Sequence, residues 1–198
     1  HALLTTVKEL DVSGISGVEW DAIELPSQLM ENFAWQWDVL YAMSRHRKSK
    51  EALPRTLFDR LFAAKNFQVG LKIIRQLGFL LFDLRIHSQE NRPWMDIYRE
   101  IQRQLSVLPQ ADYDRFPHAF THIFSGGYAA GYYSYLWAEV LSADAYDLFR
   151  RTEDRTKVGQ RFWQEVLSRG GSRPAYQSFV AFVGREPKTE ALLEQLGL

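Results

Sequence analysis

The chain has 198 residues, a size that suits one domain or one lobe of a larger protein. Its 24 basic and 24 acidic side chains cancel, which argues against a general attraction to nucleic acid or to an anionic membrane. The lack of cysteine excludes disulfides, thiolate metal ligands and a cysteine nucleophile, and it fits a reducing cytoplasm. No apolar run in the sequence is long enough to cross a bilayer.

Helical periodicity dominates and strand-like alternation is scarce, so the expected fold class is all-α, a bundle of roughly eight to ten helices. A first helix is expected to end near Glu9, before a loop that contains Gly14 and Gly17. A second helix, over residues 18–35, contains Pro26, which predicts a kink or a first-turn position. The other expected helices cover residues 36–50, 54–87 with a break near Asn66 or Gly78, 94–105, 127–150, 158–167, 175–182 and 188–195, with loops at 89–93 and 168–174.

The most distinctive segment is residues 118–139, where three tyrosines follow a pair of glycines. Tyr128, Tyr132 and Tyr135 are spaced i, i+4 and i+7, which predicts three phenols on one face of a helix. Such a row, with His122 across a flexible turn, could grip a peptide backbone or an oxyanion. The alternative is an aromatic stripe of the core, because amphipathic stripes mostly face the core.

Acidic residues recur on the second expected helix. Glu24 and Glu31 are two helical turns apart, and Asp21 shares their face. Three acids on one face usually form a solvated surface. The apolar residues around them also allow buried carboxylates with a functional role, so both interpretations stay open.

The five histidines include no His-Glu-x-x-His, the helical pair that places two imidazoles on one zinc ion. His118 and His122 are four residues apart and could share a metal if one helix carried both. Pro117 and the following glycines argue against a continuous helix there. His46 lies in the basic run at 45–50, which indicates a solvated loop or helix end rather than a binding patch.

Three stretches of the chain resemble the C-terminal part of zinc metallopeptidases of the thimet oligopeptidase family, and the oligopeptidase A group in particular. They are VEWDAIELPSQLMENFAW at 18–35, FTHIFSGGYAAGYYSYLWAEVLSADAY at 120–146, and FWQEVLSRGGSRP at 162–174 with FVGREP at 182–187. The resemblance extends over essentially all 198 residues.

The resemblance implies a cytoplasmic, zinc-dependent oligopeptidase that hydrolyses short peptides with one zinc ion. Glu24 matches the third zinc ligand of the family, and the two-turn spacing suggests that Glu31 orients a zinc-bound imidazole. His122 and Tyr135 match catalytic residues that stabilise the tetrahedral oxyanion. The matching substrate-binding positions are Tyr128, Tyr132, Gly126 and Gly127.

In that family, the other two zinc ligands and the catalytic glutamate come from a His-Glu-x-x-His helix, which these 198 residues lack. The opening HALLTT resembles what directly follows that motif, so His1 is not expected to be a ligand. Residues 1–198 are therefore expected to be the C-terminal part of a metallopeptidase catalytic domain, inactive alone. Its expected partners are short peptides and the segment with the missing motif, or another copy of the chain. The rival interpretation is a non-catalytic all-α binding or scaffold module.

Overall fold

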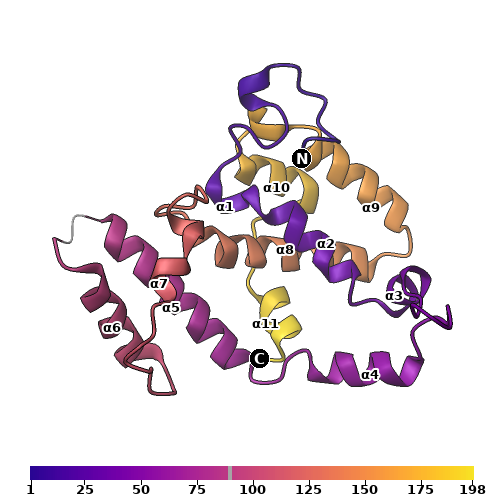
Figure 1. The fold of residues 1–198 in the computed structure, drawn as a ribbon. Coiled ribbons are helices and arrows are strands. Elements are labelled where there is room, and N and C mark those ends of the chain that lie inside the picture. The colour runs from indigo at the N-terminus through magenta and orange to yellow at the C-terminus, as the bar shows by residue number, and fades with distance from the viewer. Residues whose placement is uncertain (89–90) are drawn as a thin grey trace. The chain divides into compact units, whose positions relative to one another are not determined.

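The computed structural model describes residues 1–88 and 91–198, and every regular element among them is helical (Figure 1), which confirms the all-α class. The α-helices are α1 (Trp20–Ile23), α2 (Leu25–Phe33), α3 (Trp37–Met43), α4 (Arg55–Ala64), α5 (Val69–His87), α6 (Trp94–Leu105), α7 (Phe116–Ala119), α8 (Ser134–Arg151), α9 (Arg155–Phe162), α10 (Ala175–Val183) and α11 (Glu190–Leu196). The shorter elements are 3₁₀ turns η1 (Leu10–Val12), η2 (Thr121–Ile123) and η4 (Gly170–Ser172), and a π-helical turn η3 (Trp163–Leu167). The loop expected at 89–93 includes Gln89 and Glu90, which lie outside the described residues.

The chain divides into two compact units. The first comprises His1–Phe67 and Trp137–Leu198, and the second comprises Gln68–Leu136. Within the described parts of both units, no helix is both long enough and apolar enough to span a membrane.

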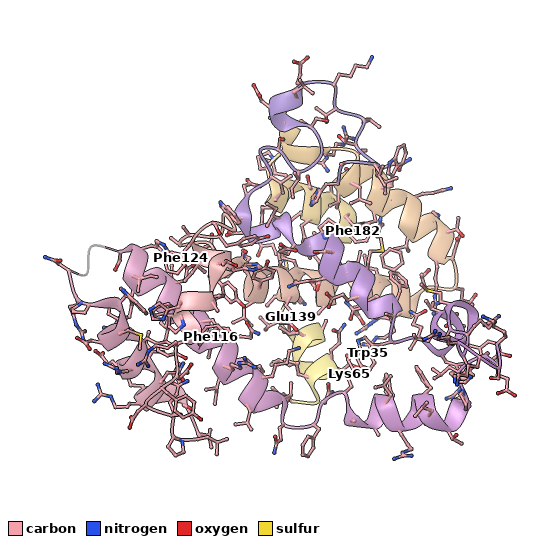
Figure 2. All side chains as sticks on the ribbon, in the orientation of Figure 1. Trp35, Lys65, Phe116, Phe124, Glu139 and Phe182 are labelled. Atoms are coloured by element: carbon pink, nitrogen blue, oxygen red, sulfur yellow. The ribbon has the colours of Figure 1, made fainter. Side chains whose placement is uncertain are left out.

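The core of the first unit collects apolar side chains from α1, α2, α8, α9, η3 and α10. Leu29 and Phe182 are fully buried, and Phe182 is labelled among the side chains of Figure 2. Edge-to-face aromatic pairs join Phe162 to Phe182, with 5.1 Å between ring centroids, and Phe33 to Phe149, with 5.4 Å. α1 and α2 both contribute side chains to this core. Their packing fixes the junction between the two helices, which carries Glu24.

A buried ion pair in the first unit anchors the segment that follows α10. Asp144 on α8 is 1% exposed, and its two oxygens accept hydrogen bonds from Arg185 at 2.7 and 2.6 Å. The backbone N–H of Lys188 donates a third hydrogen bond at 2.9 Å. A bidentate arginine and a backbone donor compensate the desolvation of this carboxylate, so Asp144 has a structural role.

The second unit is built on α5 and α6, which lie side by side (Figure 1). α6 buries Ile97, Tyr98 and Ile101, which share one face because Ile101 follows Ile97 by four residues and Tyr98 by three. Phe82 from α5 completes this surface, and Ile123 from η2 packs on the same cluster. The apolar face of α6 is predictable from its spacing, and the observed helix has the bounds that the sequence predicts.

The first predicted helix is wrong. Residues 1–9 form no helix, and the only helical turn before Gly14 in the structure is η1. The backbone N–H and the hydroxyl of Thr6 both donate to the carbonyl of Ser168, at 3.1 and 3.2 Å. The N–H of Val7 donates to the Thr5 hydroxyl at 3.2 Å. These bonds use the donors that a helix would need, as threonine side chains and tertiary partners often do.

The predicted helix at 18–35 is split into α1 and α2 at Glu24, and Pro26 occupies the first turn of α2. A proline is tolerated there because its missing N–H would have no helical partner. The long pattern at 54–87 is likewise split into α4 and α5, with Gln68 at a left-handed φ of 53° in the break. That break lies near Asn66, as predicted, and Gly78 stays inside α5.

The helix predicted at 36–50 is also wrong over its basic end, because α3 ends at Met43. In the turn that follows, the N–H of His46 donates to the carbonyl of Glu51 at 2.7 Å. Lys50 adopts a φ of 64°, which an α-helix cannot contain. The basic run is therefore an exposed turn, in agreement with the solvated interpretation.

We expect the second unit to lose stability in alkali through Tyr98. Burial, and then its hydrogen bond to Asp114 at 3.1 Å, raise the pKa of Tyr98 from 10.0 to about 12. Since the folded pKa lies above the unfolded one, this contribution is complete below pH 10 and is lost as the pH rises towards 12. Two pKa units correspond to about 3 kcal/mol. Urea unfolding of wild type and Tyr98→Phe at pH 8 and pH 11.5 should show a steeper alkaline loss for wild type. Equal losses would contradict the assignment.

Candidate functional site

Residues 126–133, which carry Tyr128 and Tyr132, form a folded-back turn, whereas Tyr135 lies in the first turn of α8. α8 begins at Ser134, so the helix predicted at 127–150 is wrong over its first two turns. The N–H of Gly126 donates to the carbonyl of Thr121 at 2.8 Å, and the N–H of Tyr128 donates to that of His122 at 3.0 Å. These bonds fold residues 126–133 back onto η2. The phenols are therefore not aligned by one helical face.

The turn nevertheless brings the predicted residues together in the second unit. The rings of Tyr128 and Tyr135 stack with their centroids 5.1 Å apart and an interplanar angle of 16°. The His122 ring centroid lies 4.8 Å from that of Tyr128, and the Tyr132 ring centroid lies 5.2 Å from that of Tyr135. We call these four side chains the His–Tyr cluster. The sequence predicted its membership correctly and its backbone incorrectly.

Within the cluster, a hydrogen bond joins Nε2 of His122 to the phenolic oxygen of Tyr135, at 2.7 Å. His122 is exposed, whereas Tyr128 and Tyr135 are half-buried. A phenol that is oriented by an imidazole can donate a hydrogen bond to a developing negative charge. The exposed side of this pair can therefore receive a carbonyl oxygen of a ligand.

Tyr132 belongs both to the core and to the cluster, the two interpretations that the sequence left open for the tyrosines. Its ring packs against Phe79 and Phe120 of the second core, with centroid distances of 6.1 and 5.2 Å. Its hydroxyl donates to Oε1 of Gln76 at 3.2 Å. Burial, and then the neighbouring Tyr135, raise the pKa of Tyr132, so its phenol stays protonated. Tyr132 is thus a partly core residue whose ring also contacts Tyr135.

The two glycines of the turn are constrained in different ways. A Cβ on Gly126 would lie 2.7 Å from both Cα and the carbonyl oxygen of His122, so the backbone would have to move. Gly127 has open space around it but a φ of +85°. We expect Gly127→Ala to cost about 1–2 kcal/mol, the usual penalty of a left-handed residue with a Cβ.

Gly126→Ala is expected to destabilise the protein more than Gly127→Ala does and to displace His122. Chemical denaturation gives the free energy of unfolding of each variant, and peptide turnover reports the displacement of His122. Equal effects in both assays would contradict the close approach at Gly126.

Glu24 lies in the first unit, at the junction of α1 and α2. Its carboxylate is half-buried, and its Oε2 accepts a hydrogen bond from the Ser27 hydroxyl at 2.7 Å. Glu31, which the sequence places on the same helix face as Glu24, is exposed on α2. Nε2 of His1 lies 3.1 Å from the carbonyl oxygen of Ile23, beside this junction. Among the described residues, no three His, Cys, Asp or Glu side chains are grouped so that they could hold a metal ion.

The two histidines spaced i, i+4 in the sequence, His118 and His122, lie in two different elements. His118 belongs to α7 and His122 to η2, and Phe120 interrupts the helical backbone between them. The His118 ring packs edge-to-face against Trp94, with 4.8 Å between centroids. His122 is engaged with Tyr135. The i, i+4 spacing therefore does not correspond to one helical face.

Sequence reasoning missed one residue of this region, Asp83 on α5. Its side chain is fully buried, and its oxygens accept hydrogen bonds from the backbone N–H groups of Ala130 and Tyr132, both at 2.9 Å. The available signal was a single acid directly after the apolar run Phe79–Phe82. A charge that interrupts the apolar face of a helix needs a buried partner.

The fold and the cluster define an all-helical protein with an exposed, polar aromatic site on a glycine-containing turn. The chain matches Peptidase family M3 over residues 1–198, and it belongs to that family.

Its relatives include oligopeptidase A of Salmonella typhimurium, which is 49% identical over 203 residues, and oligopeptidase A of Escherichia coli, which is 48% identical over 203 residues. The probable cytosolic oligopeptidase A of Arabidopsis thaliana is 43% identical over 210 residues. Each comparison covers 100% of this chain and 30% of the relative. The chain therefore spans about a third of the length of these relatives.

Proposed function

We propose that residues 1–198 are the C-terminal part of the catalytic domain of a zinc-dependent oligopeptidase that hydrolyses short peptides. Membership of Peptidase family M3 supports the peptidase class, and the three relatives described above carry the name oligopeptidase A. The observation that carries the proposal is the hydrogen bond between His122 and Tyr135 on an exposed turn. With the Nε2–H of His122 donating to the phenolic oxygen, the phenolic O–H of Tyr135 is left to donate to the oxyanion of peptide hydrolysis.

The proposed roles follow from the contacts within the His–Tyr cluster and from the exposure of His122. Tyr135 donates its phenolic hydrogen to the carbonyl oxygen as that oxygen gains negative charge, and the Nε2–H of His122 donates to the phenolic oxygen, which orients Tyr135 and stabilises the same charge through the phenol. Tyr128, stacked on Tyr135, contacts the substrate, and Tyr132 supports the stack. Gly126 and Gly127 let the substrate backbone approach the turn.

A catalytic zinc ion takes three protein ligands, and this chain offers Glu24 as one of them. The described residues contain no complete set of metal ligands, so the donor set of this chain does not by itself fit the ion. We assign the other two ligands and the general base to a His-Glu-x-x-His segment outside these 198 residues. When bound, zinc would supply a Lewis acid and an activated water. Glu31 would orient an imidazole ligand from the surface of α2.

The proposed substrates are short peptides, and the proposed location is the cytoplasm. The balanced charge gives no general attraction to nucleic acid or to an anionic membrane. The lack of cysteine is compatible with a reducing compartment.

The proposal is tested with the full-length protein and quenched-fluorescent peptides of different lengths. We expect hydrolysis of short peptides that a chelator abolishes and stoichiometric zinc restores, with folded proteins left uncut. The 198-residue chain alone is expected to cleave no peptide and to bind zinc weakly in titration calorimetry. Peptide binding by a full-length protein that cleaves nothing with zinc present would contradict the proposal and favour a binding module.

A further inference from the structure

Asp83 is a buried carboxylate that interacts with the turn of the His–Tyr cluster. It lies in the last part of α5 and is 0% exposed. Its Oδ1 accepts a hydrogen bond from the N–H of Ala130, and its Oδ2 accepts one from the N–H of Tyr132, both at 2.9 Å. Nδ1 of His87, one helical turn along α5, lies 2.8 Å from Oδ1. The carboxylate therefore has partners on both oxygens, as a buried charge requires.

The two backbone donors, the N–H groups of Ala130 and Tyr132, belong to a stretch of the turn whose conformation is held by contacts outside it. Ala130 has a φ of 55°, in the left-handed region that costs energy for a residue with a Cβ. Such conformations persist where surrounding contacts hold them. Ala130 and Tyr132 flank Gly131, in the stretch between Tyr128 and Tyr135. A side chain that holds both N–H groups thus fixes the backbone on which the aromatic rings depend.

His87 supports the Asp83 anchor, by which we mean the two hydrogen bonds from the N–H groups of Ala130 and Tyr132 to the Asp83 carboxylate. His87 is the last residue of α5, about a quarter of its side chain is exposed, and Nδ1 also lies 3.0 Å from the carbonyl oxygen of Asp83. Its ring lies 5.9 Å from that of Phe124, which belongs to the segment before Gly126. The histidine therefore links Asp83 to the other side of the turn.

We propose that Asp83, supported by His87, is a positioning residue that holds the 126–133 turn so that Tyr135 and His122 face the substrate carbonyl. The role rests on the proposed peptidase function. Asp83 does not touch the substrate in this scheme, and it acts through the backbone of Ala130 and Tyr132. Its substitution should therefore disturb turnover by loosening the oxyanion donor, not by removing it.

The test uses Asp83→Asn in the full-length protein, because asparagine keeps the size of the side chain and loses one acceptor. Its NH₂ group would face an N–H donor of the turn or His87. We expect kcat for a short peptide to fall about 10- to 100-fold, the range in which small misplacements of catalytic groups act. The matched control is Asp144→Asn, which also alters a buried carboxylate, 1% exposed, in the first unit. It should lower the melting temperature and leave kcat of the folded enzyme within about twofold, since its carboxylate holds Arg185 and the N–H of Lys188 rather than the 126–133 turn.

Two readouts separate positioning from general stability. Hydrogen–deuterium exchange of the peptide covering 126–133 should speed up at least tenfold in Asp83→Asn and not in Asp144→Asn. In the Tyr135→Phe background, Asp83→Asn should add little further loss in kcat, because both changes affect one donor. Full additivity of the two losses, or unchanged exchange in Asp83→Asn, would overturn the proposal.

A second variant covers the case in which Asp83→Asn does not fold. His87→Ala alters a partly exposed site at a helix end and leaves both backbone hydrogen bonds to Asp83. We expect a threefold to tenfold rise in exchange of 126–133 with a smaller fall in kcat, and wild-type exchange would overturn the anchor. If either variant speeds exchange of 126–133 but wild type cleaves no peptide with zinc present, the proposed function fails while the anchoring of the turn by Asp83 is confirmed.

Discussion

Tyr135→Phe is expected to lower kcat of the full-length protein by about 10²- to 10³-fold, the usual loss when one oxyanion donor is removed. KM should change less than about threefold, because the phenol interacts most strongly with charge that develops in the transition state. The ring stays, so its stack with Tyr128, at 5.1 Å between centroids, should persist. Steady-state kinetics with a short fluorogenic peptide measures both constants.

Three companion variants make this result interpretable. Tyr113→Phe removes a phenol from an 83% exposed side chain in the same unit and should leave both constants unchanged. Tyr128→Phe should have more of its effect in KM, because Tyr128 is proposed to hold the substrate. His122→Ala combined with Tyr135→Phe should be less than additive, since a hydrogen bond of 2.7 Å joins the two side chains. Negligible effects at both Tyr128 and Tyr135 would return the cluster to a packing role.

Much of the helical content was predictable, because many helices are amphipathic over their whole length. α6 has the predicted bounds, since Ile97 and Ile101 mark one face and Pro93 precedes the helix. The start of α2 is explained by Pro26, which occupies the first turn of the helix. A first-turn position was one of the two alternatives, beside a kink, that the sequence predicted for this proline. In these segments local preference and tertiary packing agree, so periodicity is sufficient.

The failures occur where hydrogen bonds between distant residues replace helical ones. Thr6 donates to Ser168, 162 residues away, and no local pattern contains that partner. Residues 127–133 have helical spacing of tyrosines, yet Gly127 at a φ of 85° and Ala130 at 55° leave the right-handed region. The spacing of the phenols correctly indicated that their rings lie together, and it was misleading about the backbone that carries Tyr128 and Tyr132.

The candidate site was predictable in its residue types and not in its support. His122 and the tyrosines are close in sequence, so a single turn can gather them. Asp83 lies 47 and 49 residues before its partners Ala130 and Tyr132, and one acid in an apolar helix does not identify its acceptor role. The residues that hold a site in place are identified by their burial and hydrogen bonds, which depend on the folded structure and not on local sequence.

Glu24→Gln is expected to remove zinc-dependent turnover in the full-length protein. If Glu24 is a direct ligand, the loss should exceed the roughly 10- to 100-fold that follows from removing a partner of a ligand. A neutral amide is a poor substitute for a carboxylate on zinc, and the substitution keeps size and shape. Glu24 is half-buried between α1 and α2, so glutamine should be accommodated without a change in the core.

Metal content and activity are measured together, by elemental analysis of the dialysed protein and by peptide turnover at increasing zinc concentration. Ser27→Ala, which removes the 2.7 Å hydrogen bond to Glu24, should reduce zinc affinity by about tenfold, as changes around a ligand commonly do. Glu31→Gln should show a loss of similar size if Glu31 orients an imidazole ligand.

The matched control for Glu24→Gln is Glu9→Gln, an exposed acid of the same unit, which should change neither property. Each of the two substitutions removes one negative charge, so a difference between the two variants reflects the site and not the net charge. A Glu24→Gln protein with one zinc per chain and wild-type turnover would exclude Glu24 as a ligand. Because Tyr135 and His122 are proposed to act on the oxyanion and not on the metal, their variants should keep the zinc that Glu24→Gln is expected to lose.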